Sequence, residues 1–151
     1  MKQTTKTNLK MLRIGLIAMF VLLVIQFTVG MYLNFYTELP ATHPGTGESF
    51  APSIPWALAS HAGSALAIHV TVWMLLTLGA IALLVRGIMS KRKAFIVGTS
   101  FGLLFILAAG SSGLAFLNRG GDDRESFMMA IDFILAFVAY GVTFYKTKEQ
   151  A

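Results

Sequence analysis

The sequence predicts an all-α fold, an integral membrane four-helix bundle whose helices run antiparallel in up-down order. Two observations carry this prediction. First, 56% of the 151 residues are hydrophobic and only 13% are charged, whereas an ordinary soluble domain carries about 25% charged residues. The mean hydropathy of +0.70 agrees with lipid as the natural solvent. Second, the apolar residues form four long runs, and a membrane-spanning helix needs about 20 residues. We expect one domain over residues 1–151.

The first expected span covers residues 14–36, IGLIAMFVLLVIQFTVGMYLNFY, and follows a basic N-terminal segment. A signal peptide also starts with basic residues, but its apolar core has roughly 7–15 residues and ends in small residues. This run is longer and ends in aromatic residues, so we predict a retained helix. The other expected spans cover residues 55–85, 94–117 and 127–145. Short connections make neighbouring spans antiparallel.

The outer connection over residues 37–54 contains prolines and glycines, which indicate turns rather than helix. It is long enough to fold back over the bundle as a lid. Its His43 and Glu48 are candidate metal ligands, but two ligands without a tight motif favour a solvated loop, and we assign no metal site. In the connection between the third and fourth spans, Asp122 and Glu125 have the spacing of a helix capping box, which we favour over a calcium site.

The charges are distributed asymmetrically along the chain. The N-terminal segment, the connection over residues 86–93 and the C-terminal segment hold all but two of the twelve Lys and Arg residues. The positive-inside rule therefore places both termini in the cytoplasm. The isoelectric point near 9.8 then indicates contact with anionic lipid headgroups, not with nucleic acid. The absence of cysteine excludes disulfides, iron–sulfur clusters and thiol nucleophiles.

Polar side chains lie within the expected spans at intervals that place several of them on one helix face. Each stripe has a packing interpretation, because small residues let helices approach and serine or glutamine side chains join them by hydrogen bonds. Asp132 fits packing less well, since an aspartate at mid-helix costs ~2.5–3.5 kcal/mol on insertion scales and usually faces the bundle interior. The polar residues are Gln26 and Asn34 in the first span, His61 and His69 in the second, Ser111 and Ser112 in the third, and Asp132 in the fourth.

Most of these residues fall in the outer half of the expected bundle. His61 and His69 are separated by about 12 Å along a helix, so His61 lies near the outer interface and His69 lies nearer the midplane. The shared depth predicts a polar cavity that opens toward the outside and is covered by the proline-rich loop. Within this cavity we expect Asp132 and His69 to pair. The alternative is a buried structural pair without a cavity.

The first functional hypothesis is redox, with haem b or a quinone in the cavity, because histidines inside membrane helices are common haem ligands. His61 and His69 are too far apart to bind the same iron, whose two axial nitrogens lie only about 4 Å apart. A second ligand must therefore come from elsewhere, and we select Met128. The other candidates are Met31, Met129, His43 and a second His69 in a homodimer.

Two further hypotheses stay open. One is an accessory or assembly subunit of a larger membrane complex with no chemistry of its own, which needs only the packing stripes but leaves Asp132 unexplained. The other is proton-linked transport of a small solute through Asp132 and His69, although four spans without inverted repeats make a poor transporter alone. The chain holds no catalytic triad, phosphate loop or zinc motif, so we assign no catalytic residue.

Three segments, MYLNFYTELPATHPG, IPWALASHAGSALAIHVTVW and GLAFLNRGGDDRESFMMA, together resemble a family of small bacterial four-span membrane proteins over residues 31–145. The resemblance implies the four-span topology and a bacterial cytoplasmic (inner) membrane. It implies no activity and no site residue. A looser resemblance to four-helix b-type cytochromes rests on His61 and His69 alone.

Overall fold

The structure is a computed structural model that describes residues 2–40, 42–47, 52–59, 63–119 and 121–148. Four long helices and one short helix follow one another along the chain, and no strand occurs among the described residues. The helices are α1 (Lys2–Tyr36), α2 (Ser53–Leu58), α3 (Ser64–Met89), α4 (Lys93–Asn118) and α5 (Asp123–Lys148).

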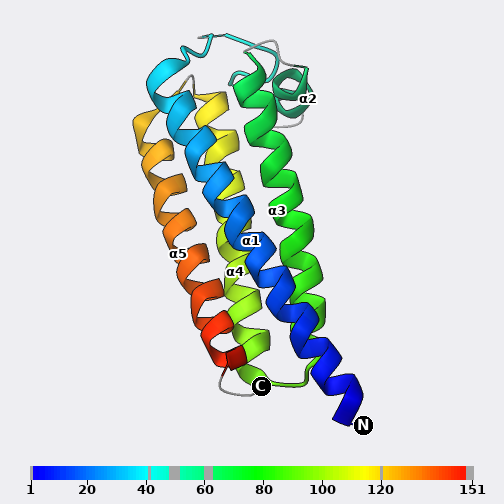
Figure 1. Cartoon of the computed structure of the whole chain (residues 1–151). Helices are drawn as coiled ribbons and strands as arrows, with labels where there is room; N and C mark the ends of the chain where they lie inside the picture. The colour runs from blue at the N-terminus through cyan, green and yellow to red at the C-terminus, as the bar shows by residue number, and fades with distance from the viewer. Residues whose placement is uncertain (1, 41, 48–51, 60–62, 120, 149–151) are drawn as a thin grey trace.

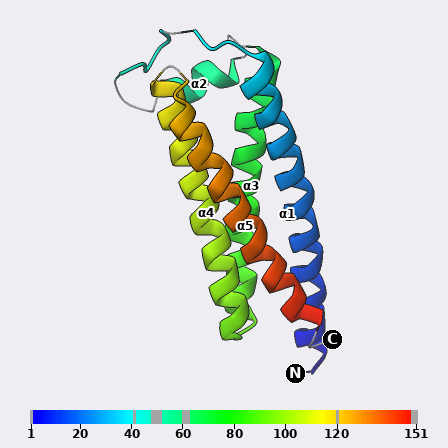
Figure 2. The ribbon, with the colours of Figure 1, turned by 90° about the vertical axis from the view of Figure 1, so that its left-hand side faces the viewer.

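The four long helices lie side by side as an elongated bundle (Figure 1). α1 begins and α5 ends at the same end of this bundle, which we call the terminal end. Helix α2 and the described residues between α1 and α2 lie across the opposite end, the loop end (Figure 2). α1 packs mainly against α3, and α5 packs mainly against α4. The prediction of an all-helical fold with four long apolar helices is confirmed.

Each long helix contains a segment that is long and apolar enough to cross a membrane. Large apolar side chains also cover the outside of the bundle, for example Leu78 and Phe127, each 64% exposed. A helix that is apolar on all sides fits the interior of a large protein or a lipid bilayer. The pattern suggests a multi-pass membrane protein. The four segments are Asn8–Tyr36, Ser64–Met89, Lys93–Asn118 and Asp123–Thr147.

The second expected span, residues 55–85, begins too early. The chain first forms the short helix α2, and the long helix α3 begins only at Ser64. Gly63, just before it, has a φ of 96°, a backbone conformation that interrupts a helix and that glycine adopts without a steric penalty. Hydropathy does not reveal this interruption, because small and apolar residues lie on both sides of it.

The long helices also continue beyond their apolar runs. α1 begins at Lys2 rather than at residue 14, and α3 ends at Met89 rather than at residue 85. α4 and α5 likewise extend past the expected 94–117 and 127–145. Helical hydrogen bonding does not require apolar side chains, and lysine and arginine are good helix formers. The apolar run therefore underestimates the length of each helix.

The terminal half of the bundle is densely packed around a cluster of buried apolar side chains that draws on all four long helices. Where α4 meets α5, Gly98 and Gly102 have no room for a Cβ, because Thr143 and Tyr140 lie directly against them. Such close approach is the usual role of small residues between membrane helices. The half of the bundle nearer the terminal end is therefore tightly packed, in contrast to the half nearer the loop end, the loop half.

Candidate functional site

A cavity of about 550 Å³ lies in the loop half, between the four long helices. Volumes of roughly 300–1,000 Å³ are typical of small-molecule sites, and such sites have mostly apolar walls with a few polar groups. The wall here follows that pattern. The structure brings to it four polar residues that the sequence singled out: Gln26 and Asn34 from α1, His69 from α3 and Asp132 from α5.

His69 forms a hydrogen bond with Gln26 at the cavity wall. The Nε2 atoms of the two side chains are 3.0 Å apart, so the amide donates and the ring nitrogen accepts. Gly30, one turn after Gln26, permits the contact, because a Cβ there would lie only 3.0 Å from His69 Cε1. α1 and α3 thus approach closely enough to hold the imidazole between them.

This pair leaves two buried atoms without partners. Among the described residues, nothing bonds to His69 Nδ1 or to Gln26 Oε1. If the amide donates to Nε2, then Nδ1 carries the ring proton and is a free donor, while Oε1 is a free acceptor. If the amide is turned over, the two residues exchange these roles. Either arrangement offers a ligand one donor and one acceptor, and unpaired buried polar atoms are rare enough to need an explanation.

Trp73 lies one turn after His69 on α3 and forms part of the cavity wall. Its indole rests against Gly110 of α4, where no Cβ would fit. The indole Nε1 donates to the carbonyl oxygen of Ile106 at 3.3 Å, so the ring contributes aromatic surface to the wall rather than a free donor. We did not assign Trp73 to the site from the sequence, although its spacing from His69 was an available signal.

Asp132 faces the same cavity from α5 but does not pair with His69. No hydrogen bond or ion pair joins its carboxylate to any other described residue. His69 bonds to Gln26 of α1 instead, where Gly30 leaves room for the imidazole. Asp132 therefore stands on the wall as a separate ionisable group.

The other polar residues that the sequence singled out differ in their placement. Asn34 reaches the edge of the cavity, where its Oδ1 accepts a hydrogen bond from Ser126 Oγ of α5 at 3.2 Å. Ser111 is exposed and donates to the carbonyl oxygen of Leu107, and Ser112 is not part of the wall. Glycines of α4 face the cavity instead, since neighbouring residues on a helix point in different directions.

Of the candidate haem ligands, His69, Met31 and Met129 are at the cavity. Met128 is 43% exposed on the bundle surface and does not line the wall. The choice of Met128 over its neighbour thus selected the residue that faces outward. Among the described residues, no group of three or more His, Asp or Glu side chains is arranged to hold a metal ion. His61 and Glu48 lie outside the described residues.

The cavity carries acidic groups, and no Lys or Arg among the described residues lines it. Glu38 and Asp123 lie at its exposed edge, and Asp132 lies on its wall. Like charges placed together in a binding site cost several kcal/mol. The site is therefore unfavourable for an anionic ligand and suits a neutral or cationic one.

The described parts of residues 37–59 cover the loop end of the cavity, and we call them the roof. Leu39 and Ile54 line the cavity from this side. His43 stacks on Trp56 with ring centroids 4.1 Å apart, and its Nε2 lies 3.0 Å from the carbonyl oxygen of Leu117. His43 is thereby held in the roof and is not a cavity ligand. The placement agrees with the lid expected from the sequence.

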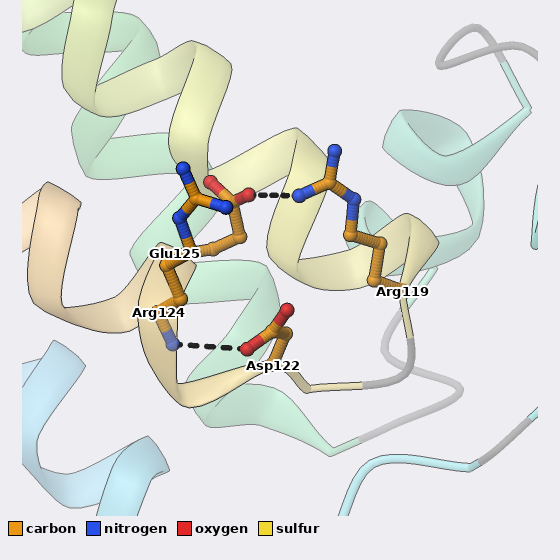
Figure 3. Close-up of polar contacts among 4 residues, drawn as sticks. All are labelled: Arg119, Asp122, Arg124 and Glu125. Atoms are coloured by element: carbon orange, nitrogen blue, oxygen red, sulfur yellow. Dashed lines mark hydrogen bonds and ion pairs between the residues drawn. The ribbon is translucent and has the colours of Figure 1, made fainter.

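The connection between α4 and α5 uses its acidic residues as a helix cap and as an ion pair (Figure 3). Asp122 Oδ1 accepts the backbone N–H of Arg124 at 3.0 Å, at the start of α5. Glu125 forms an ion pair with Arg119. The capping role expected of Asp122 is therefore confirmed, whereas Glu125 binds an arginine instead of completing the capping box.

No protein family model matches this chain, and neither a curated protein nor a solved structure is significantly similar to it. The resemblances to small bacterial four-span proteins and to b-type cytochromes stay predictions.

Proposed function

We propose that this chain is a multi-pass protein of a bacterial cytoplasmic membrane whose cavity binds the ring of a quinone in electron transfer. One observation supports the proposal above others: the His69–Gln26 pair offers one buried unpaired donor and one buried unpaired acceptor inside a mostly apolar cavity. Quinone carbonyl oxygens accept hydrogen bonds, and the hydroxyl groups of the reduced quinol also donate them. The pair therefore suits both redox forms.

The charges support an orientation with both termini in the cytoplasm. The connection between α3 and α4, at the terminal end, carries Lys91, Arg92 and Lys93. The loop end carries Glu38 and the acidic stretch over residues 122–125. The positive-inside rule then makes the terminal end cytoplasmic. In this orientation the cavity lies in the outer half of the membrane.

Two further groups support a redox ligand. Trp73 gives the ring a flat aromatic surface, and aromatic pairs gain about 0.5–1.5 kcal/mol beyond simple burial. Asp132 places an ionisable carboxyl group on the same wall. Reduction of a quinone to a quinol consumes protons as well as electrons, and intramembrane acids commonly belong to proton relays. We assign Asp132 this proton-handling role.

Haem b is the second candidate, supported by the unpaired His69 nitrogen and by the Met129 thioether at the cavity. These two residues would hold the haem, which would supply one-electron transfer. The propionate groups of haem are anionic, however, and the described wall offers carboxylates and no Lys or Arg. We therefore favour a quinone, which carries no charge.

Quinone binding is measurable through the fluorescence of Trp73, because a quinone ring beside an indole quenches it. The chain has two tryptophans, so Trp56→Phe leaves Trp73 as the only reporter. We expect a tail-less naphthoquinone to quench saturably. Gln26→Leu should weaken its affinity roughly tenfold, the effect of losing one buried hydrogen bond. Ser111→Ala is the matched control, because Ser111 lies off the cavity wall, and it should leave the affinity unchanged.

A visible spectrum of the purified protein distinguishes the two candidates. A Soret band in the parent protein that disappears in His69→Ala would show that the ligand is haem and contradict the quinone. A colourless protein whose Trp73 is not quenched by naphthoquinone would contradict both. An accessory subunit, or proton-linked transport through Asp132, would then be the leading hypothesis. A difference between wild type and Asp132→Asn in the pH dependence of thermal stability would favour the transport hypothesis.

A further inference from the structure

We propose, on the basis of the proposed function, that the quinone is a long-tailed isoprenoid quinone that enters sideways from the outer leaflet. Its route is the seam between α1 and α5, with the ring at His69 and the tail passing between Phe27 and Phe133 into the lipid. Both phenylalanines line the cavity.

The cavity wall differs in thickness around its circumference. On the α3 and α4 side, the lining residues Leu76, Ile106 and Gly110 are all buried. On the α1 and α5 side, the lining residue Phe27 is 45% exposed, and Ala130 is also exposed. The same side chains thus face the cavity and the outside of the bundle. The seam is therefore one side chain thick, whereas the lining residues named on the α3 and α4 side are covered from outside by other side chains.

The contacts that close the seam beside the cavity are few and separable. Near the loop end, Asn34 and Ser126 share one exposed hydrogen bond. Further toward the middle, the rings of Phe27 and Phe133 stack with centroids 5.1 Å apart. Exposed hydrogen bonds and stacked rings each contribute only about 0.5–1.5 kcal/mol. Such contacts can part for an apolar chain and close again around it.

Below the cavity the same two helices are held more firmly. Phe20 of α1 packs against Phe137 at 4.9 Å and against Phe144 at 6.2 Å between ring centroids. Phe20 and Phe144 also pack against the main buried cluster, as Phe133 does beside the cavity, whereas Phe27 does not. On the α1 side the seam is thus held at Phe20 in the terminal half and separable at Phe27 beside the cavity. The seam is polar near the loop end, at Asn34 and Ser126, and apolar deeper, at its phenylalanines. This order matches a lipid leaflet, which is polar at its surface and apolar inside.

The roof is a poorer route for a lipid-soluble molecule. Leu66 and Leu117 form a second buried cluster, and Leu39 and Trp56 of the roof pack against it. Ser53 Oγ donates to Asn118 Oδ1 at 3.1 Å, which ties α2 to the end of α4. Passage through the roof would require this cluster to open toward water. The seam instead opens toward lipid, where a tail of several isoprene units is soluble.

The test compares two naphthoquinones, one without a tail and one with a long isoprenoid tail, by Trp73 quenching in the Trp56→Phe protein. Ala130→Phe fills the seam. Because Ala130 also lines the cavity, any loss at the ring site affects both quinones alike. We therefore expect affinity for the long-tailed quinone to fall about tenfold more than affinity for the tail-less one, the factor expected when roughly two methylene groups lose contact. Ala82→Phe is the matched control, because Ala82 is an exposed alanine of α3 away from the cavity.

Phe27→Ala widens the seam and should speed association of the long-tailed quinone more than association of the tail-less one, which reports any change at the ring site. Equal effects of Ala130→Phe on both quinones, or no effect on either, would overturn the route. The proposed function would survive these results, since the tail-less quinone would still bind. Failure of both quinones to quench the parent protein would instead remove the proposed function itself, and the two failures are thereby distinguishable.

Discussion

Gly30 and Tyr140 each shape the contact between two helices, although the sequence pattern around them does not indicate it. Gly30 sets how closely α1 approaches His69, and the His69–Gln26 bond depends on that approach. Tyr140 is fully buried against Gly102, and its hydroxyl has no partner among the described residues. Both features follow from contacts between helices distant in sequence, so neither residue type predicts them alone.

Gly30→Ala should push the imidazole away from α1 and weaken its bond to Gln26. We expect a loss of about 1–3 kcal/mol in the free energy of unfolding, the usual cost of overpacking, together with weaker naphthoquinone binding. Denaturant unfolding in detergent micelles measures the first effect. At Gly141 nothing lies within 4 Å of an added Cβ, so Gly141→Ala should instead stabilise the helix by roughly 0.5–1 kcal/mol. Equal losses at both sites would contradict the role of Gly30.

Tyr140→Phe should leave the protein as stable as the parent or more stable, by up to about 1 kcal/mol. The reason is that burying an unpaired hydroxyl costs free energy, and removing it breaks no hydrogen bond. Unfolding of the two proteins under identical conditions measures the difference. A loss larger than about 1 kcal/mol would mean that the hydroxyl is satisfied by a buried water or by a residue outside the described parts of the chain.

At the scale of the helices, the apolar runs indicated the number of long helices but not where each begins. The interruption at Gly63 depends on one φ value, which hydropathy does not register. The rotation of each helix is equally invisible in a single sequence. Met128 and Met129 are neighbours of the same type, yet only Met129 lines the cavity. The depth of each polar residue along its helix was thus predictable from the sequence. Which side of α4 and α5 faces the cavity was not, because it depends on the helices that pack against them.

The roof provides a prediction at this scale. His43→Ala removes both the stacking on Trp56 and the contact with the Leu117 carbonyl. We expect faster amide hydrogen exchange over residues 42–47 by roughly tenfold, corresponding to a local loss of about 1–2 kcal/mol. Exchange within α4 and α5 should stay unchanged. Thr42→Ala, an exposed neighbour, is the control, and equal acceleration in both variants would contradict the anchoring role of His43.

At the scale of the whole molecule, the bundle divides into a packed terminal half and a hollow loop half. The sequence indicated this division through the depth of its polar residues, although it wrongly paired Asp132 with His69. The division gives the proposed orientation its importance, because a cavity confined to one half of a membrane-spanning bundle would lie nearer one side of the membrane. The charge distribution supports the side that we propose.

The orientation is testable in intact cells, because the chain contains no cysteine. We expect a membrane-impermeant maleimide to label Thr42→Cys, at the loop end, and not Ser90→Cys, in the connection between α3 and α4. After the cells are broken, both positions should react. Labelling of Ser90→Cys in intact cells, with Thr42→Cys protected, would reverse the topology and place the cavity on the cytoplasmic side.

The hollow half also determines how the protein responds to compression. Unfolding under hydrostatic pressure is driven by the elimination of internal voids, and it scales with their volume. A bundle whose voids lie toward one end should unfold from that end. The roof and the neighbouring turns of α1 and α5 should loosen first, while the glycine-packed contact between α4 and α5 stays intact. A molecule lodged in the cavity would remove most of that compressibility.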